Sequence, residues 1–171
     1  MSVPASRVLF VCLGNICRSP TAEGVLRHLL SQEGGGLHVE VDSAGTGDYH
    51  RGEPPDPRTQ RAAKRRGIDL SGLSARQVSR RDFEDFDLIL AMDRSNLRDL
   101  ETIRPKGSRA ELQLFLEYAG EPGRSEVPDP YTGDSDDFDE VLDLVTRASR
   151  RLIERLRAGG GTASKDRPPA R

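Results

Sequence analysis

The amino-acid sequence predicts a small doubly wound α/β domain, a parallel sheet with helices on both faces. Apolar segments of strand length alternate along the chain with segments of helical periodicity, which is the order of elements in such folds. The length of 171 residues is enough for one ordinary domain core and too short for two. We therefore expect a single domain over residues 1–157. Residues 158–171 have no apolar pattern and are expected to form a disordered tail.

Four segments have the composition of strands. Residues 7–12 are nearly continuous in branched and large apolar side chains, which is typical of a buried parallel strand. Further strands are expected at residues 37–42, 87–92 and 112–116. Residues 43–56 are rich in Gly and Pro, so we expect a loop there.

Helices are expected between and after these strands. The first begins at Pro20, a residue suited to the first helical turn, and ends at three successive glycines. A short polar helix is predicted over residues 58–66 and another helix over residues 94–103. The longest, residues 137–156, has apolar side chains at three- and four-residue spacing and a charged outer face.

Charge and cysteine content exclude several classes of protein. The 26 basic and 28 acidic residues give a formal charge of −2, so no electrostatic footprint for nucleic acid or an anionic membrane is present. The apolar run at residues 8–13 is too short for a signal peptide or a membrane span. Two cysteines, Cys12 and Cys17, are too few for a disulfide scaffold. We expect a cytoplasmic protein with no nucleic-acid partner and no membrane insertion.

Chemistry is predicted for the segment CLGNICRSP, residues 12–20, which follows the first strand. In doubly wound sheets ligands bind beyond the carboxyl ends of the strands. Gly14 and Asn15 tolerate backbone conformations closed to most residues. The N–H groups of such a loop can turn inward to bind an anion, and the N-terminus of the following helix adds further N–H groups.

A cysteine in this anion site is stabilised as the nucleophilic thiolate. Arg18 offers two parallel N–H donors to a phosphate, and Ser19 can donate a hydrogen bond to the Cys12 sulfur. The loop is thus predicted to hold a tetrahedral dianion over a nucleophile, without a metal or other cofactor. Three histidines show no metal-ligand spacing and are expected to be ordinary surface or partly buried residues: His28, His38 and His50.

A second candidate element is Asp129, which stands between Pro128 and Pro130. An Asp-Pro pair by itself most often marks a turn. Transfer of a phosphoryl group from an aryl ester, however, requires a proton for the leaving phenolate. A carboxylic acid held between two prolines is a suitable donor.

Five segments occur together in one order, at residues 12–20, 42–46, 75–77, 92–97 and 129–131. With them the chain resembles the low-molecular-weight protein tyrosine phosphatases over roughly residues 7–156. The resemblance implies a four-stranded parallel, flavodoxin-like sheet. It also implies Cys12 as nucleophile, Arg18 as phosphate clamp, Asp129 as general acid and then base, and Ser19 as support for the thiolate.

The resemblance extends to the surroundings of the nucleophile. Asn15, bonded to Ser43, would hold the loop in shape, and Tyr49 and Tyr131 would form an aromatic rim that receives the substrate ring. The implied phosphate-binding loop consists of Leu13, Gly14, Asn15, Ile16, Cys17 and Ser19. The implied partners are phosphotyrosine-containing proteins, with a cognate tyrosine kinase as a candidate.

Two positions depart from the family pattern. Leu73 stands where a histidine is often part of the polar network behind the loop, so we expect another residue to close that network. Thr132 stands where a second tyrosine frequently follows the first, which narrows the aromatic rim.

Four other functions compete with this reading. Protein-arginine phosphatases share the fold and the loop, but their version of the loop resembles one with Thr where this chain has Ile16. Arsenate reductases need further cysteines for a disulfide relay, and none follows Cys17. A silent phosphopeptide-binding module could have lost Cys12 or Asp129, and this chain keeps both. A redox sensor would pair Cys12 with Cys17 as regulation added to a phosphatase; the alternative for Cys17 is a buried core residue.

Overall fold

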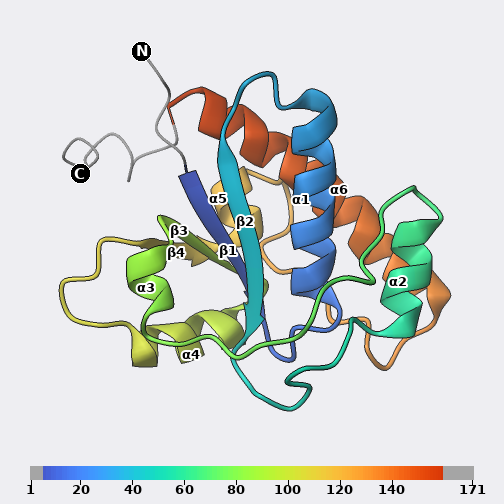
Figure 1. Cartoon of the computed structure of the whole chain (residues 1–171), viewed down its shortest axis with the longest axis horizontal. Coiled ribbons are helices and arrows are strands. Elements are labelled where there is room, and N and C mark those ends of the chain that lie inside the picture. Colours follow the sequence, from blue (N-terminus) through green and yellow to red (C-terminus); the bar gives the residue numbers. More distant parts are fainter. Residues whose placement is uncertain (1–5, 160–171) are drawn as a thin grey trace.

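A four-stranded parallel sheet forms the centre of the computed structural model, which describes residues 6–159 (Figure 1). Its strands lie in the order β2-β1-β3-β4. They are β1 (Ser6–Cys12), β2 (Val39–Gly45), β3 (Leu88–Ala91) and β4 (Glu111–Leu114). From β1 the chain passes to β2 on one side and then to β3 on the other. This order confirms the predicted doubly wound, flavodoxin-like sheet and places its switch point beside β1.

Helices cover both faces of the sheet (Figure 1). Helices α1 and α6 pack together on one face, and α2 and α5 pack against α6. Helices α3 and α4 cover the other face. The bounds are α1 (Arg18–Glu33), α2 (Pro57–Lys64), α3 (Asp82–Asp85), α4 (Arg94–Ile103), α5 (Phe115–Ala119) and α6 (Ser135–Arg157).

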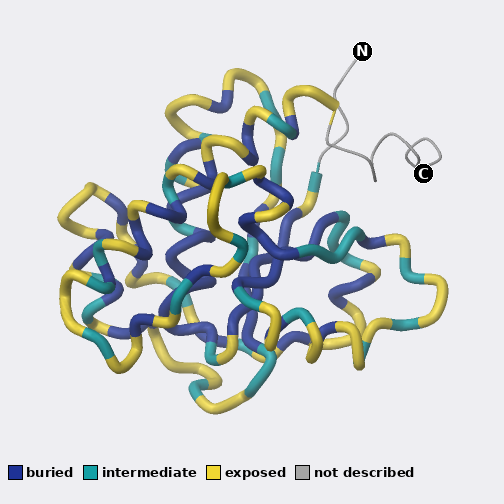
Figure 2. Tube along the Cα trace, turned by 180° about the vertical axis from the view of Figure 1, so that it is seen from behind, coloured by how far each residue is buried: buried dark blue, intermediate teal, exposed yellow. Residues whose placement is uncertain are grey.

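Side chains of β1 enter two separate cores. Val8, Phe10 and Cys12 belong to the larger core, beneath α1 and α6. Leu9 and Val11 belong to the smaller core, beneath α3 and α4. From Val8 to Cys12 both faces of β1 are therefore buried, which explains why this part of the strand is apolar. Figure 2 shows the resulting contrast between the buried centre and the exposed connecting loops.

The helix predictions are confirmed, with small shifts at the termini. Helix α4 has the predicted bounds, whereas α1 begins at Arg18 rather than Pro20. Helix α6 begins at Ser135 because Asp134 caps it, accepting hydrogen bonds from the N–H groups of Asp136 and Asp137.

The prediction for residues 43–56 is wrong at its beginning. β2 continues to Gly45, and Ser43 pairs with Phe10 while Gly45 pairs with Cys12. Small residues such as these signal a turn when read locally, but here the neighbouring strand supplies their hydrogen-bond partners. As a result Ser43 lies at the level of the loop that follows β1.

The predicted strand at residues 112–116 is also wrong at its end. β4 stops at Leu114, and Phe115 and Leu116 begin helix α5. A short apolar run does not distinguish a buried strand from a buried helix. Phe115 is fully buried and packs edge-on against Phe10, with ring centroids 4.9 Å apart, so the larger core determines the conformation. The short helix α3 was not predicted.

Two further expectations concern the ends of the chain and the membrane. The predicted tail at residues 158–171 lies, from residue 160 onward, outside the described residues. Within residues 6–159, no helix combines the length and the apolar character that crossing a bilayer requires.

Candidate active site

The loop after β1 directs a backbone N–H at the sulfur of Cys12. Asn15 has φ 57°, the left-handed region, and among residues 6–159 no other non-glycine residue has a positive φ. Asn is one of the few side chains that tolerate this conformation. The turn brings the Asn15 N–H to 3.3 Å from Cys12 Sγ, so the strained residue contributes directly to the surroundings of the sulfur.

The end of β2 supports this loop from behind. The N–H groups of Thr46 and Gly47 donate to the carbonyl oxygens of Cys12 and Leu13, each at 2.9 Å. A Cβ at Gly45 would lie 2.6 Å from the Leu13 carbonyl oxygen. Only glycine permits this close approach of the two backbones.

Three side chains form a hydrogen-bond network beneath the loop: Asn15, Ser19 and Ser43, called the loop network below. The Arg76 N–H donates to Asn15 Oδ1 at 2.9 Å. Asn15 Nδ2 then donates to Ser19 Oγ at 2.8 Å and to Ser43 Oγ at 3.0 Å. Because Ser19 Oγ accepts from Asn15, its own proton is available to Cys12 Sγ, 3.0 Å away.

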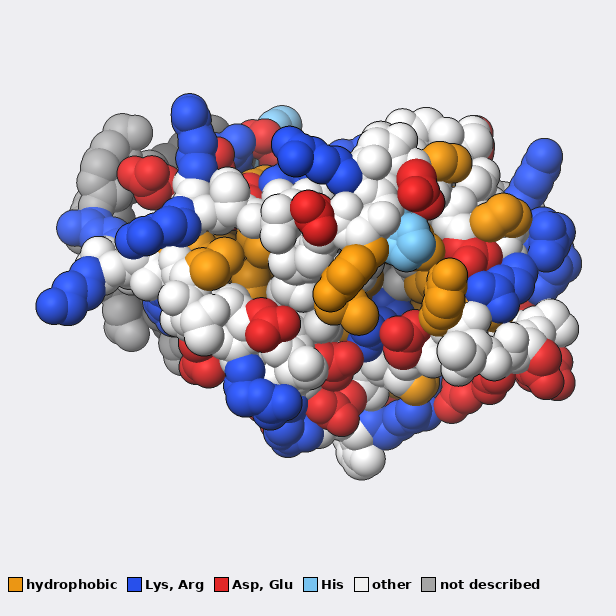
Figure 3. Space-filling view, turned by 90° about the horizontal axis from the view of Figure 1, so that it is seen from below, with side chains coloured by type: hydrophobic (Ala, Val, Ile, Leu, Met, Phe, Trp, Pro, Cys, Tyr) orange, Lys and Arg blue, Asp and Glu red, His pale blue; other side chains and the backbone are white. Residues whose placement is uncertain are grey.

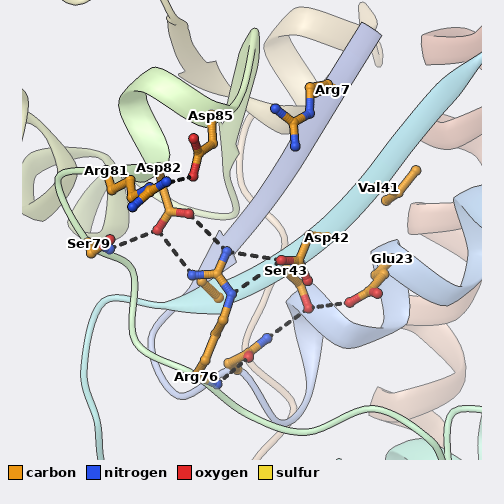
Figure 4. A network of polar contacts seen from close by, with 12 residues as sticks. Arg7, Glu23, Val41, Asp42, Ser43, Arg76, Ser79, Arg81, Asp82 and Asp85 are labelled. Atoms are coloured by element: carbon orange, nitrogen blue, oxygen red, sulfur yellow. Dashed lines mark hydrogen bonds and ion pairs between the residues drawn. The ribbon is translucent and has the colours of Figure 1, made fainter. Parts of the chain in front are cut away.

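The other branch of the loop network ends on a buried carboxylate. Ser43 Oγ donates to Glu23 Oε1 at 2.6 Å, as Figure 4 shows. The second Glu23 oxygen pairs with Arg27 at 2.8 Å. Burial raises the pKa of Glu23, although Ser43 and Arg27 oppose the rise. Leu73 packs at the margin of the larger core, so Glu23 and Arg27 close the network from α1.

Arg18 is a buried cation beside Cys12. Its NH1 donates to Asp93 Oδ2 at 2.7 Å and to the Val127 carbonyl at 3.2 Å. Its NH2 lies 3.5 Å from Asp129 Oδ2. Burial opposes the charged form, but Cys12, Asp93 and Asp129 outweigh it and raise the pKa of Arg18. Arg18 therefore stays positive where a phosphate would bind.

Asp129 lies at the mouth of the site, on the loop before α6. Its side chain is 46% exposed. The Tyr131 N–H donates to Asp129 Oδ1 at 3.1 Å, which leaves Oδ2 on the Arg18 side. The carboxyl group is thus held above the loop and remains open to a substrate.

These groups surround a pocket of about 140 Å³. The loop residues and Arg18 form its base, and Tyr49, His50, Asp129 and Tyr131 complete its wall. Figure 3 shows hydrophobic side chains, a histidine and acidic side chains around a hollow on this face. The two tyrosines are 71% and 47% exposed, so an aromatic rim stands over a polar base.

Sequence reasoning missed two residues of the site. His50, expected to be ordinary, lines the pocket, faces the Tyr131 ring at 6.3 Å and bonds Glu53 at 3.1 Å. No local spacing marked it. Asp93 was recognised only as part of the segment at residues 92–97, but its carboxylate holds Arg18 in the structure. The position of Asp93 just before α4 explains why it accepts from the Asn96 N–H. That position does not explain its contact with Arg18.

Cys17 is buried on the core side of the loop. Cys12 and Cys17 form no disulfide bond in this structure. Burial raises the pKa of Cys17 to about 12. Cys17 is therefore a neutral thiol at physiological pH, the unreactive form of a cysteine side chain.

Comparisons with known proteins agree with this geometry. A family model described as "Low molecular weight phosphotyrosine protein phosphatase" matches residues 7–160. A protein of that name from Schizosaccharomyces pombe is 52% identical over 152 residues, covering 88% of this chain and 96% of the relative.

Solved structures are similar as well. A protein tyrosine phosphatase from Entamoeba histolytica has a TM-score of 0.84 and 36% identity, covering 90% of this chain and 98% of its own. A drosophila arginine phosphatase has a TM-score of 0.81 and 33% identity, covering 87% of this chain and 96% of its own.

Proposed function

The chain belongs to the low molecular weight phosphotyrosine protein phosphatase family, and we propose that it hydrolyses phosphotyrosine in proteins through a phosphocysteine intermediate on Cys12. The observation that carries the mechanism is the convergence on Cys12 Sγ of the Asn15 N–H at 3.3 Å and Ser19 Oγ at 3.0 Å. Donors placed in this way favour a thiolate over a thiol.

The first step transfers the phosphoryl group to sulfur. The loop N–H groups and Arg18 bind the phosphate oxygens, and the Cys12 thiolate attacks phosphorus opposite the leaving oxygen. An S–P bond forms and the P–O bond to the aryl group breaks. Asp129 gives its proton to the leaving phenolate oxygen and becomes a carboxylate.

The second step regenerates the enzyme. The Asp129 carboxylate accepts a proton from water, whose oxygen attacks phosphorus and breaks the S–P bond. Orthophosphate leaves, and Cys12 is again a thiolate. Ser19 Oγ, 3.0 Å from the sulfur, stabilises that leaving thiolate. Because Arg18 and the N–H groups balance the phosphate charge, we propose that no metal is required.

Among phosphorylated hydroxyl side chains, phosphotyrosine best fits the depth of the pocket. Cys12 is 2% exposed, whereas Leu13, Tyr49 and Tyr131 above it are 44%, 71% and 47% exposed. A phosphotyrosine ring is long enough to place phosphorus at Cys12 while lying between the two tyrosines. Phosphoserine and phosphothreonine are shorter, so their backbones would meet the rim before the phosphate reached the loop.

Phosphoarginine is the second candidate substrate, favoured by the similarity to the drosophila arginine phosphatase. Its guanidinium has the length to reach the loop. However, Ile16 lines the pocket with an apolar side chain, and a guanidinium requires hydrogen-bond acceptors. We therefore place phosphotyrosine first.

The test measures turnover of phosphotyrosine, phosphoserine and phosphoarginine peptides that are otherwise identical in sequence. Both the native chain and Ile16→Thr are assayed, in the presence of a metal chelator. We expect phosphotyrosine to be strongly preferred and the variant to shift the ratio toward phosphoarginine. Faster cleavage of phosphoarginine by the native chain would leave the mechanism standing and overturn the assigned substrate.

We also propose a cytoplasmic location and redox regulation. The mechanism needs Cys12 as a free thiolate, and reducing compartments keep it so. Peroxide would convert the thiolate to a sulfenic acid. The Cys17 thiol, on the same loop, would then displace water to form a disulfide that thiols reduce.

A cognate tyrosine kinase is the proposed source of the substrates.

A further inference from the structure

Arg76 joins three separate segments of the chain behind the loop (Figure 4). Its guanidinium bonds Asp82 of α3 through both terminal nitrogens, at 3.1 and 3.0 Å. It also bonds Asp42 of β2 through Nε and NH2, at 3.2 and 3.0 Å. The Asp82 side chain is 6% exposed and that of Asp42 is 42% exposed. Charge-assisted pairs with this geometry hold a guanidinium in one place.

The backbone of Arg76 acts on the loop network. Its N–H can only donate, and it meets the Asn15 side chain at 2.9 Å. This contact requires Asn15 to turn its oxygen toward Arg76 and its nitrogen toward Ser19 and Ser43. With the amide reversed, two N–H groups would face each other and Ser19 would lose its donor.

The orientation of Asn15 determines where the Ser19 proton points. Ser19 Oγ has two acceptors nearby, Cys12 Sγ at 3.0 Å and the Ala44 carbonyl at 3.4 Å. Because Oγ already accepts from Asn15, its single proton is directed to the closer sulfur. The side chain of Arg76 is therefore coupled to the thiolate through its own N–H, Asn15 and Ser19.

Backbone pairing also holds this segment. Gly45 N–H donates to the Arg76 carbonyl, and Val78 N–H donates to the Gly45 carbonyl, both at 2.8 Å. Neither bond engages the peptide unit that carries the Arg76 N–H; the opposite edge of that unit, the Ala75 carbonyl, accepts from the Gly52 N–H at 2.8 Å, and the side-chain ion pairs fix the Arg76 Cα next to it. Side-chain variants therefore separate the two contributions.

We propose that Arg76, with Asp42 and Asp82, is a positioning residue that keeps Cys12 poised as a thiolate. The role rests on the proposed nucleophile. It predicts a change in the titration of Cys12 reactivity, which loss of fold stability alone does not produce.

The experiment measures the pH dependence of Cys12 alkylation by iodoacetamide in the native chain, Arg76→Gln and Asp42→Asn, with the modified cysteine identified by peptide mass. We expect the midpoint to rise by about half a unit or more in Arg76→Gln and by less in Asp42→Asn. The kcat for an aryl phosphate should fall about tenfold in Arg76→Gln, with a smaller change in KM. Arg76→Lys should recover part of both losses, because the charge remains and the fork is lost.

Arg147→Gln is the matched control. Arg147 is one of two arginines that pair with the buried Glu121, at 3.2 Å, so its loss should lower stability and leave the midpoint unchanged. A native midpoint in both Arg76→Gln and Asp42→Asn would overturn the proposal. If Arg76→Gln does not fold, the midpoint of Asp42→Asn decides the test. This variant should fold, because the Asp42 side chain is partly exposed. Rapid quench of the native chain tests the nucleophile separately: absence of phosphocysteine would reject the proposed function, whatever the midpoints.

Discussion

The loop network and the aromatic rim lie on opposite sides of Cys12 and differ in burial and in bonding. Asn15, Ser19 and Ser43 are 3%, 0% and 5% exposed, and each forms at least two side-chain hydrogen bonds. Tyr49 and Tyr131 are 71% and 47% exposed. The Arg58 guanidinium lies over the Tyr131 ring, 5.5 Å from its centroid.

This difference separates two tasks. A buried and fully bonded network is costly to alter, since any lost partner leaves a polar group unsatisfied. It suits the orientation of donors toward a developing charge. An exposed aromatic side chain with few neighbours can adapt to different peptides at low cost. We infer that the chemistry depends on the loop network and substrate choice on the aromatic rim.

The largest expected effect comes from the sulfur itself. Cys12→Ser should abolish turnover, by about 10³-fold or more, because a serine hydroxyl stays protonated in the same anion site. Inorganic phosphate should still bind, because its donors remain. Rapid quench of the native chain with labelled substrate should recover phosphate on Cys12. Label on another residue would contradict the mechanism.

The second-largest effect is expected for Asp129, the proposed general acid. Asp129→Ala should slow aryl phosphates with poor leaving groups by about 10²- to 10⁴-fold and those with good leaving groups much less. An equal loss for leaving groups of very different basicity would mean that Asp129 is not the donor.

Changes at the aromatic rim should be smaller and confined to substrate binding. One ring contact contributes about 1 kcal/mol, or roughly fivefold. Tyr49→Ala and Tyr131→Ala should therefore raise KM for phosphotyrosine peptides several-fold and leave inhibition by inorganic phosphate unchanged. Arg58→Gln should have a weaker effect of the same kind, with the exposed Arg61→Gln as control. A kcat loss matching that of Asp129→Ala would contradict the separation of tasks.

Redox behaviour provides a fourth test. After brief peroxide treatment, thiols should restore activity to the native chain but not to Cys17→Ala, whose Cys12 would oxidise further. Because burial raises the pKa of Cys17 to about 12, this protection of the native chain should increase as the pH of the peroxide treatment rises. Equal recovery of the two proteins would show that Cys17 serves packing alone.

The smallest expected effect is on the pH dependence of thermal stability, through Asp56 beside the aromatic rim. Hydrogen bonds from Arg58 are the main cause that lowers the pKa of Asp56. A lowered carboxyl pKa stabilises the fold above the unfolded pKa, near 4, and this stability is lost as the pH falls through the folded pKa. Asp56→Asn should lower the Tm by a few degrees at pH 7 and by less at pH 3. An equal change at both values would exclude this linkage.

The sequence was informative where structure and chemistry are local. The apolar run of β1, the bounds of α4 and the segment from Cys12 to Pro20 were all readable from composition and spacing. Each depends on residues within one element, or on backbone preferences of single residues such as Asn15. The same local reading failed at the end of β2 and at Phe115, where a neighbouring strand and the core determine the conformation.

What only the tertiary structure decided is which distant groups meet at the loop. The hydrogen bond from Arg76 to Asn15 spans 61 positions, and that from Arg18 to Asp93 spans 75. His50 enters the pocket from a loop whose own sequence predicted no role for it. No periodicity encodes such contacts, because they arise when the parallel sheet brings the carboxyl ends of its strands to one edge. The candidate nucleophile could therefore be proposed from the sequence, while the groups that contact its loop were found only in the structure, where β1, β2 and the segment around Arg76 lie side by side.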